Sequence, residues 1–250
     1  MARHRIHAGT DIACVGVWDA GLPFAERSVE GKALEASATR GEVLTIDTHA
    51  DGGYLLQFHV DEPFVPEPWQ RFETVENALG LHLGSGTAVA GGCEDFRSSR
   101  PRITSTADRF QVEPSWYRVR VHLNRMEGSE DEQRAHAEAA RSLTAEELSR
   151  YQQMGKSHRA GWLLAVMAGA SLVTSVFVQA RLVPGVLGAL LAVAAGWRLL
   201  RLKRSDYDAL HLRYEAAFAA AVSPDIVMEL HREPGPLPGG FVSLEGPASS

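Results

Sequence analysis

The stretch Trp116-Tyr-Arg-Val-Arg-Val-His-Leu123 alternates apolar and polar side chains without a break. One face of such a strand would carry Tyr117, Val119, Val121 and Leu123, and the other face Arg118, Arg120 and His122. Strict alternation is typical of a half-buried strand in an antiparallel sheet, with one face on the core and one in water. A β-rich domain is therefore expected around this segment.

Further strands are expected on the N-terminal side of this segment. Short apolar or alternating stretches, separated by glycine- and proline-rich turns, lie at 10–18, 43–47, 54–60, 78–83 and 87–90. Asp51-Gly52-Gly53 has the composition of a hairpin turn between two of them. Short strands at this spacing are typical of a sandwich or barrel. The sequence predicts a cytoplasmic, antiparallel all-β sandwich over residues 1–128.

Two runs with almost no charged residues follow this region. Residues 160–180 carry no charged side chain and are about as long as the roughly 20 residues that cross a bilayer core as a helix. Residues 184–200 form a second run with one charge, Arg198, near its end. Basic residues flank the pair on the outside, so the positive-inside rule places both termini in the cytoplasm. The prediction is a transmembrane hairpin in the inner membrane, partnered by lipid; the alternative is a hairpin buried against protein.

Small residues recur at every fourth position in both runs. They are Gly161, Ala165 and Gly169 in the first run, and Gly188, Ala192 and Gly196 in the second. Such stripes let helix backbones approach closely in a membrane. They predict helix packing within one chain or between chains of a homo-oligomer, unless they only reflect how common Gly and Ala are in this sequence.

The segments around the two runs are predicted to be mostly helical. Residues 129–143 are polar and helix-prone, as in a linker, and Thr144-Ala-Glu-Glu147 matches a capping box. An amphipathic helix is expected to pack near Tyr151, because apolar residues recur every four positions at Leu210, Tyr214, Phe218 and Val222. Residues 223–250 are expected to form a short strand and a disordered tail. The predicted fold class is α+β by segregation, with the helical part at 144–222.

Composition and motifs limit the function. A net charge of −6 argues against a general affinity for nucleic acid, and 45% hydrophobic residues exclude global disorder. Cys14 and Cys93 are the only cysteines, too few for a disulfide scaffold, and they are expected to be reduced thiols. The sequence has no phosphate loop, nucleophile elbow or dinucleotide fingerprint. Accordingly, no enzymatic activity, cofactor or nucleic-acid partner is predicted.

Two polar clusters are candidate sites. The acidic and imidazole side chains of His49, Asp51, His59, Asp61 and Glu62 could hold a divalent metal, but strand alternation favours an exposed polar face and no metal is predicted. The second cluster contains Arg97, Arg100 and Arg102, together with the tryptophan Trp69. It is the candidate binding site for an anionic ligand or an acidic protein partner. Nearby carboxylates leave open that these arginines are only solvated loop charges.

Several local motifs resemble a broad group of small bacterial all-β proteins, some of which occur in toxin–immunity settings. The motifs are Gly16-Val-Trp-Asp19, Ala78–Gly86 leading to Ala90-Gly-Gly-Cys93, and Val112-Glu-Pro114 before Tyr117–Val121. They cover about the first 125 residues, and Ser115-Trp116 replaces the Pro-Gly of the group. The resemblance implies a binding-type sandwich with no active-site residues. The helical half is similar in layout to two-span membrane effector modules.

These observations lead to three hypotheses of different classes. The first is a non-enzymatic, membrane-anchored protein whose sandwich binds a protein or ligand in an immunity, adaptor or sensory role. The second is a partner- or ligand-regulated pore in a bacterial defence system. The third is a metal-dependent hydrolase that uses His49 and His59.

Overall fold

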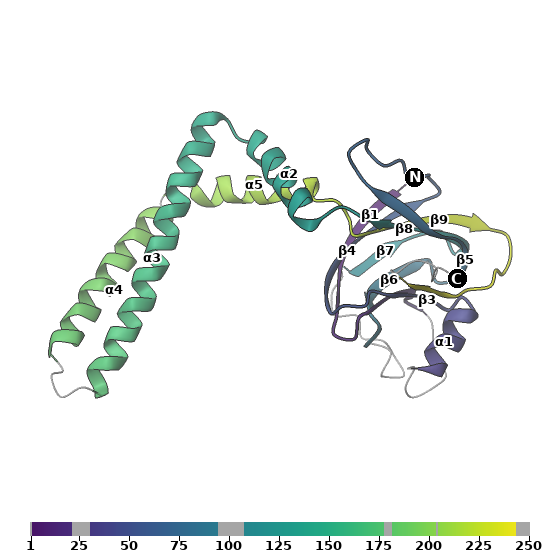
Figure 1. Ribbon diagram of the computed structural model, residues 1–250, viewed down its shortest axis with the longest axis horizontal. Helices are drawn as coiled ribbons and strands as arrows, with labels where there is room; N and C mark the ends of the chain where they lie inside the picture. Colours follow the sequence, from purple (N-terminus) through teal and green to yellow (C-terminus); the bar gives the residue numbers. More distant parts are fainter. Residues whose placement is uncertain (1, 22–30, 95–107, 178–181, 204, 244–250) are drawn as a thin grey trace. The chain divides into compact units, whose positions relative to one another are not determined.

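The computed structural model describes residues 2–21, 31–94, 108–177, 182–203 and 205–243, which form two compact units (Figure 1). Unit 1 takes residues 1–127 and 223–250, and unit 2 takes residues 128–222. Unit 2 is therefore inserted in the sequence of unit 1, whose strands come from both ends of the chain.

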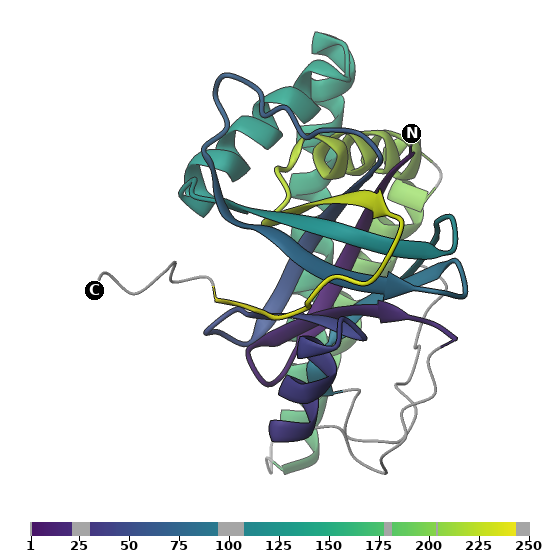
Figure 2. The same cartoon turned by 90° about the vertical axis from the view of Figure 1, so that its right-hand side faces the viewer.

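Unit 1 contains two five-stranded sheets (Figure 2). Sheet A has the order β1 (Ala2–Thr10), β4 (Gly52–Val60), β9 (Ile226–Glu233), β8 (Ser115–Asn124) and β5 (Phe72–Leu83). Sheet B has the order β10 (Phe241–Ser243), β3 (Val43–Asp47), β2 (Cys14–Asp19), β6 (Thr87–Gly92) and β7 (Arg109–Gln111). The helix α1 (Lys32–Thr39) contacts β3 and β10.

The two sheets enclose one hydrophobic core, which explains the alternation of the strands. Val15 and Leu44 of sheet B and Phe58 and Val119 of sheet A are all completely buried in the same cluster. The inward side of β8 also carries Tyr117, whose hydroxyl donates to the Glu113 carbonyl at 2.6 Å. Burial raises the pKa of this tyrosine to about 12. The half-buried strand predicted at 116–123 is confirmed.

The predicted all-antiparallel sandwich within residues 1–128 is wrong in two respects. Strands β4 and β9 are parallel, as are β10 and β3. In addition, β9 lies between β4 and β8 in the middle of sheet A, although it comes from the C-terminal region. Its inward residues Ile226, Met228 and Leu230 belong to the main core. The sandwich therefore needs the C-terminal strands, and the chain is a mixed α and β fold.

The hairpin turn predicted at Asp51-Gly52-Gly53 is wrong, because Gly52 and Gly53 already belong to strand β4. Strand β3 belongs to sheet B and β4 belongs to sheet A, so the chain crosses from one sheet to the other. The backbone leaves β3 at Thr48, whose N–H donates to the Ala13 carbonyl at 2.8 Å. Composition alone fixes neither the exact position of a turn nor the strand to which it leads.

Unit 2 is helical. Its elements are α2 (Gly128–Arg141), α3 (Ala145–Phe177), α4 (Leu182–Lys203) and α5 (Tyr207–Ala221). The capping box is confirmed, because the Thr144 N–H donates to Glu147 Oε2 at 2.9 Å and the Glu147 N–H donates to Thr144 Oγ1 at 3.2 Å. The predicted packing of α5 near Tyr151 is also confirmed, since this ring stacks on Tyr214 with centroids 5.1 Å apart.

Among the described residues, no helix combines the length and the apolar character that a bilayer crossing requires. The prediction of a transmembrane hairpin at 160–180 and 184–200, and of a multi-pass inner-membrane location with cytoplasmic termini, is therefore overturned. The lipid partner and the pore lose their basis with it. The prediction relied on the absence of charge, yet many of the uncharged positions are Gly, Ala, Ser or Thr, which contribute much less to insertion than Leu, Ile, Phe or Val.

Helices α3 and α4 pack against each other through small residues spaced seven apart. The buried ones are Gly161, Ala168, Gly188 and Ala195. A Cβ on Gly161 would lie 3.3 Å from Leu199 Cδ2 of α4, so this glycine permits a close approach. The other members of the four-residue stripes are half-buried or exposed, namely Ala165, Gly169, Ala192 and Gly196. Seven-residue spacing is typical of helix pairs that coil around each other.

Candidate functional site

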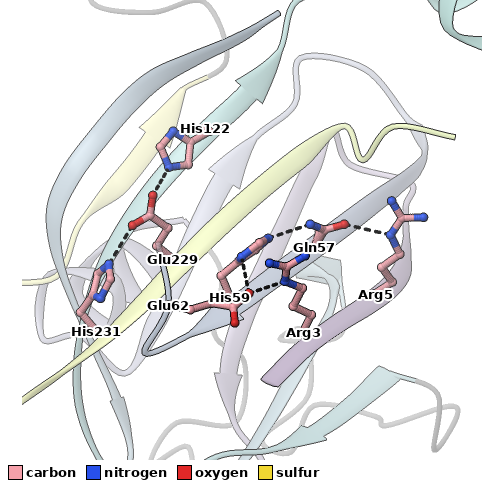
Figure 3. A network of polar contacts seen from close by, with 8 residues as sticks. All are labelled: Arg3, Arg5, Gln57, His59, Glu62, His122, Glu229 and His231. Carbon is pink, nitrogen blue, oxygen red and sulfur yellow. Dashed lines mark hydrogen bonds and ion pairs between the residues drawn. The ribbon is translucent and has the colours of Figure 1, made fainter. Parts of the chain in front are cut away.

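A row of polar side chains crosses the outer face of sheet A, opposite the core (Figure 3). Strand register places Arg3 beside His59, His59 beside Glu229, and Glu229 beside Arg120. Residues from four strands are thereby brought into one line. We call the following set the polar strip: Arg3, Arg5, Gln57, His59, Glu62, Arg120, His122, Glu229 and His231.

Glu229 is the centre of the polar strip and is only 1% exposed. His122 Nε2 donates to its Oε1 at 2.8 Å, and His231 Nε2 donates to its Oε2 at 2.7 Å. The ionised carboxylate can only accept, which assigns a proton to both of these nitrogens. Burial raises the pKa of Glu229, but the hydrogen bonds from His231 and His122 outweigh burial, so the pKa lies below its ordinary value. The strip thus holds a buried negative charge.

His122 continues the line toward the edge strand β5. Its Nδ1 lies 2.8 Å from the exposed Thr74 hydroxyl, which donates to it because Nε2 carries the ring proton. Burial lowers the pKa of His122 despite the opposing hydrogen bond with Glu229. A hydroxyl, an imidazole and a carboxylate in this order could form a nucleophilic relay. However, the same contacts satisfy the polar atoms of a buried network, and we assign them that structural role.

His59 forms the second half of the polar strip. Its Nε2 accepts from the Gln57 amide at 2.7 Å, and its Nδ1 lies 3.2 Å from Glu62 Oε1, within ion-pair distance but poorly aligned for a hydrogen bond. Two arginines of β1 hold these partners, since Arg3 binds Glu62 and Arg5 Nε donates to Gln57 Oε1 at 2.9 Å. Burial and the nearby charge of Arg3 lower the pKa of His59. The ring is therefore neutral near pH 7.

The segment between β4 and β5, residues 61–71, is here called the crossing loop. Its Phe64 ring lies between His59 and His122, with both ring-centroid distances 5.3 Å. Since these histidines lie on β4 and β8, the loop passes over the outer face of sheet A. Val65 and Trp69 of the same loop are 77% and 39% exposed. The crossing loop thus covers the histidines and presents two apolar side chains outward.

The predicted basic cluster is only partly described. Arg97, Arg100 and Arg102 lie outside the described residues. Trp69 lies in the crossing loop, next in sequence to Gln70, whose amide reaches the Ser223 hydroxyl at 3.5 Å. Of the predicted binding residues, Trp69 is therefore the one that the structure describes, and it lies in the loop that crosses the outer face of sheet A.

The structure separates the five residues that were weighed, and not favoured, as a metal site. His59 and Glu62 belong to the polar strip, whereas His49 Nε2 lies 2.9 Å from the Ser243 hydroxyl of β10. The remaining two carboxylates have other partners, because Asp51 accepts from the Ala13 N–H and Asp61 pairs with Arg232. In the part of the chain that the structure describes, no three His, Cys, Asp or Glu side chains are arranged to hold a metal.

Sequence reasoning missed Glu229 and His231, the residues at the centre of the polar strip. Their signal was present, because Ile226-Val-Met-Glu-Leu-His231 alternates inward and outward like the strand at 116–123. Residues 223–250 were expected to form only a short strand and a tail. His122 was correctly placed on a polar face, but its burial against Glu229 was not foreseen.

Acid is expected to destabilise unit 1. In the folded chain the pKa values of His59 and His122 lie below 6.5 and that of Glu229 lies below 4.5, so the unfolded state binds more protons in acid. Stability is therefore lost as the pH falls from about 6.5 through the folded pKa values of the histidines, and further below about 4.5. Thermal unfolding midpoints measured between about pH 7 and pH 4 check this. A midpoint that stayed constant or rose would contradict the assigned protonation states.

Two solved structures resemble the chain weakly, and no family model and no curated protein matches it. One is titled "Crocagin biosynthetic gene J", with a TM-score of 0.32, 15% identity and coverage of 49% of this chain and 79% of that chain. The other is ComJ from Bacillus subtilis, inhibitor of the DNA-degrading activity of NucA, with a TM-score of 0.31, 9% identity and coverage of 48% and 80%. The resemblance expected for residues 1–125 thus stands only as a loose structural likeness, and similarity this low carries no argument about function.

Proposed function

We propose that unit 1 is a non-enzymatic protein-binding module whose outer face on sheet A recognises an acidic surface of a protein partner. One observation carries the proposal: the arginine side chains of two ion pairs are much more exposed than their carboxylate partners. The side chains of Arg3 and Arg120 are 68% and 46% exposed, whereas those of Glu62 and Glu229 are 13% and 2% exposed. A partner would therefore meet positive charge on a chain whose net charge is −6.

The crossing loop supplies the apolar part of the proposed binding surface. Trp and Arg are enriched among the residues that dominate interface energies, and Trp69 and Val65 are exposed on the loop that crosses this face. Phe64 packs between two buried histidines and so fixes the loop before binding. A loop that is already ordered loses less conformational entropy when a partner binds. An immunity, adaptor or sensory role would follow from such binding, and the partner's identity would decide among them.

Trp69→Ala is expected to weaken partner binding by roughly 30-fold or more, because a truncated hot-spot side chain costs about 2 kcal/mol or more. The partner is first captured with a photo-crosslinking amino acid at position 69 and identified by mass spectrometry. Its affinity for wild type and variant is then measured by calorimetry. Trp162→Ala, in α3 of unit 2 and 57% exposed, is the matched control and should leave the affinity unchanged. Equal affinities for Trp69→Ala and wild type would contradict the proposal.

The exposed arginines of β8, Arg118 and Arg120, are expected to affect mainly the rate at which the partner associates. Replacing Arg118 and Arg120 by alanine should lower the association rate about tenfold at low salt and reduce its dependence on ionic strength. Stopped-flow measurements over a range of salt concentrations test this. Arg141→Ala, exposed on α2, is the control for a charge removed elsewhere. A double variant with unchanged rate and salt dependence would exclude an acidic partner surface.

A further inference from the structure

The two cysteines of the chain lie side by side although 79 positions separate them. Strand β2 begins at Cys14, β6 ends just before Cys93, and the register of these strands pairs Val15 with Gly92. The next step along an antiparallel pair brings Cys14 opposite Cys93. Their Sγ atoms are 2.8 Å apart, less than an ångström beyond a covalent S–S bond of about 2.05 Å.

The two thiols differ in accessibility. Cys93 is buried in a small cluster with Trp18 and Val89, whereas Cys14 is half-buried and can be reached from solvent. The hydrogen bond with Cys93 lowers the pKa of the Cys14 thiol, although burial opposes ionisation. A more accessible thiol, next to a buried second thiol, has the arrangement of an attacking and a resolving cysteine.

We infer that Cys14 and Cys93 close reversibly into an intramolecular disulfide when the chain meets a low-molecular-weight disulfide such as oxidised glutathione. The Cys14 thiolate attacks one sulfur of the oxidant, which forms a mixed disulfide and releases one glutathione thiolate. The Cys93 sulfur, after losing its proton, attacks the Cys14 sulfur and releases the second glutathione. The two protein thiols together lose two protons and two electrons, and the oxidant becomes two thiols.

The bond would fix one wall of a pocket in unit 1. This pocket has a volume of about 450 Å³ and is lined among others by Thr10, Asp11, Gly92 and Glu94. The Glu94 carboxylate accepts from the Thr10 hydroxyl and the Asp11 N–H, both at 3.2 Å, and Thr10 Oγ1 accepts from the Cys14 N–H at 3.1 Å. These hydrogen bonds connect the turn after β1 with the end of β6. A Cys14–Cys93 bond would add a covalent link beside them, between the start of β2 and the end of β6.

The test uses the full chain, equilibrated with reduced or oxidised glutathione. Intact mass and free-thiol content are measured, followed by thermal unfolding. Wild type in oxidised glutathione should lose both thiols and two hydrogens, carry no glutathione and form no disulfide between chains. Its unfolding midpoint should rise by about 10 °C, because the bond closes a long loop in the unfolded chain. Dithiothreitol should reverse both changes.

Two variants separate the roles of the thiols. Cys93→Ala should keep a stable glutathione on Cys14, because no second thiol resolves the mixed disulfide. Cys14→Ser should react far more slowly, since the remaining thiol is buried. Wild-type chains that retain both thiols, carry glutathione at equilibrium or form disulfide-linked dimers would each overturn the inference.

Discussion

Residues 1–127 expressed alone are expected to remain unfolded, whereas the same region joined to residues 223–250 by a short Gly/Ser turn is expected to fold. Strand β9 pairs with β4 on one side and with β8 on the other, so its loss divides sheet A. Three inward side chains at 1% exposure or less leave the core with it: Ile226, Met228 and Leu230. At about 1.5–3 kcal/mol each, their burial alone is comparable to the 5–15 kcal/mol that stabilises a typical protein.

The geometry of the insertion makes the joined variant feasible. The Asn124 N–H donates to the Asp225 carbonyl at 2.9 Å, so the end of β8 and the start of β9 meet as in a hairpin. A short Gly/Ser turn can therefore replace residues 128–222. Circular dichroism and thermal unfolding of both variants provide the measurement. Cooperative unfolding of residues 1–127 alone would show that β9 is dispensable.

Replacing Glu229 by alanine is expected to lower the free energy of unfolding by about 3–5 kcal/mol, the typical loss when one partner is removed from a buried charged network. The change removes the shared acceptor of His122 and His231 and leaves two buried or half-buried N–H groups without their bonds. Glu229→Gln keeps the shape and one acceptor oxygen, so a smaller loss of about 1–3 kcal/mol is expected.

Urea unfolding of the two variants, with Glu233→Ala as the control, gives the comparison. Glu233 lies on the same strand and pairs with Arg118, whose side chain is about half exposed, so its removal should cost no more than about 1 kcal/mol. If Glu229→Ala lost no more stability than Glu233→Ala, the buried carboxylate would not organise the polar strip.

The candidate site could be predicted from the sequence only in part. Alternation at 116–123 correctly separated Val119 and Val121 from the polar face that contains His122. It could not show that His122 is buried, because its partner Glu229 lies 107 positions further along the chain. Alternation assigns a side chain to a face but does not identify the neighbouring strand, and the central pairing of sheet A was therefore missed.

The sequence by itself determined the local features, which depend only on residues close together in the chain. The period of a strand, the capping box at Thr144–Glu147 and the four-residue repeat of α5 depend on local geometry, and the structure contains all three. Tertiary structure alone decided the parallel pairing of β4 with β9, the polar strip and the contact between Cys14 and Cys93. These contacts join segments that are far apart in the sequence. Which segments pair depends on how much apolar surface the whole fold buries and on how many buried polar groups find a hydrogen-bond partner.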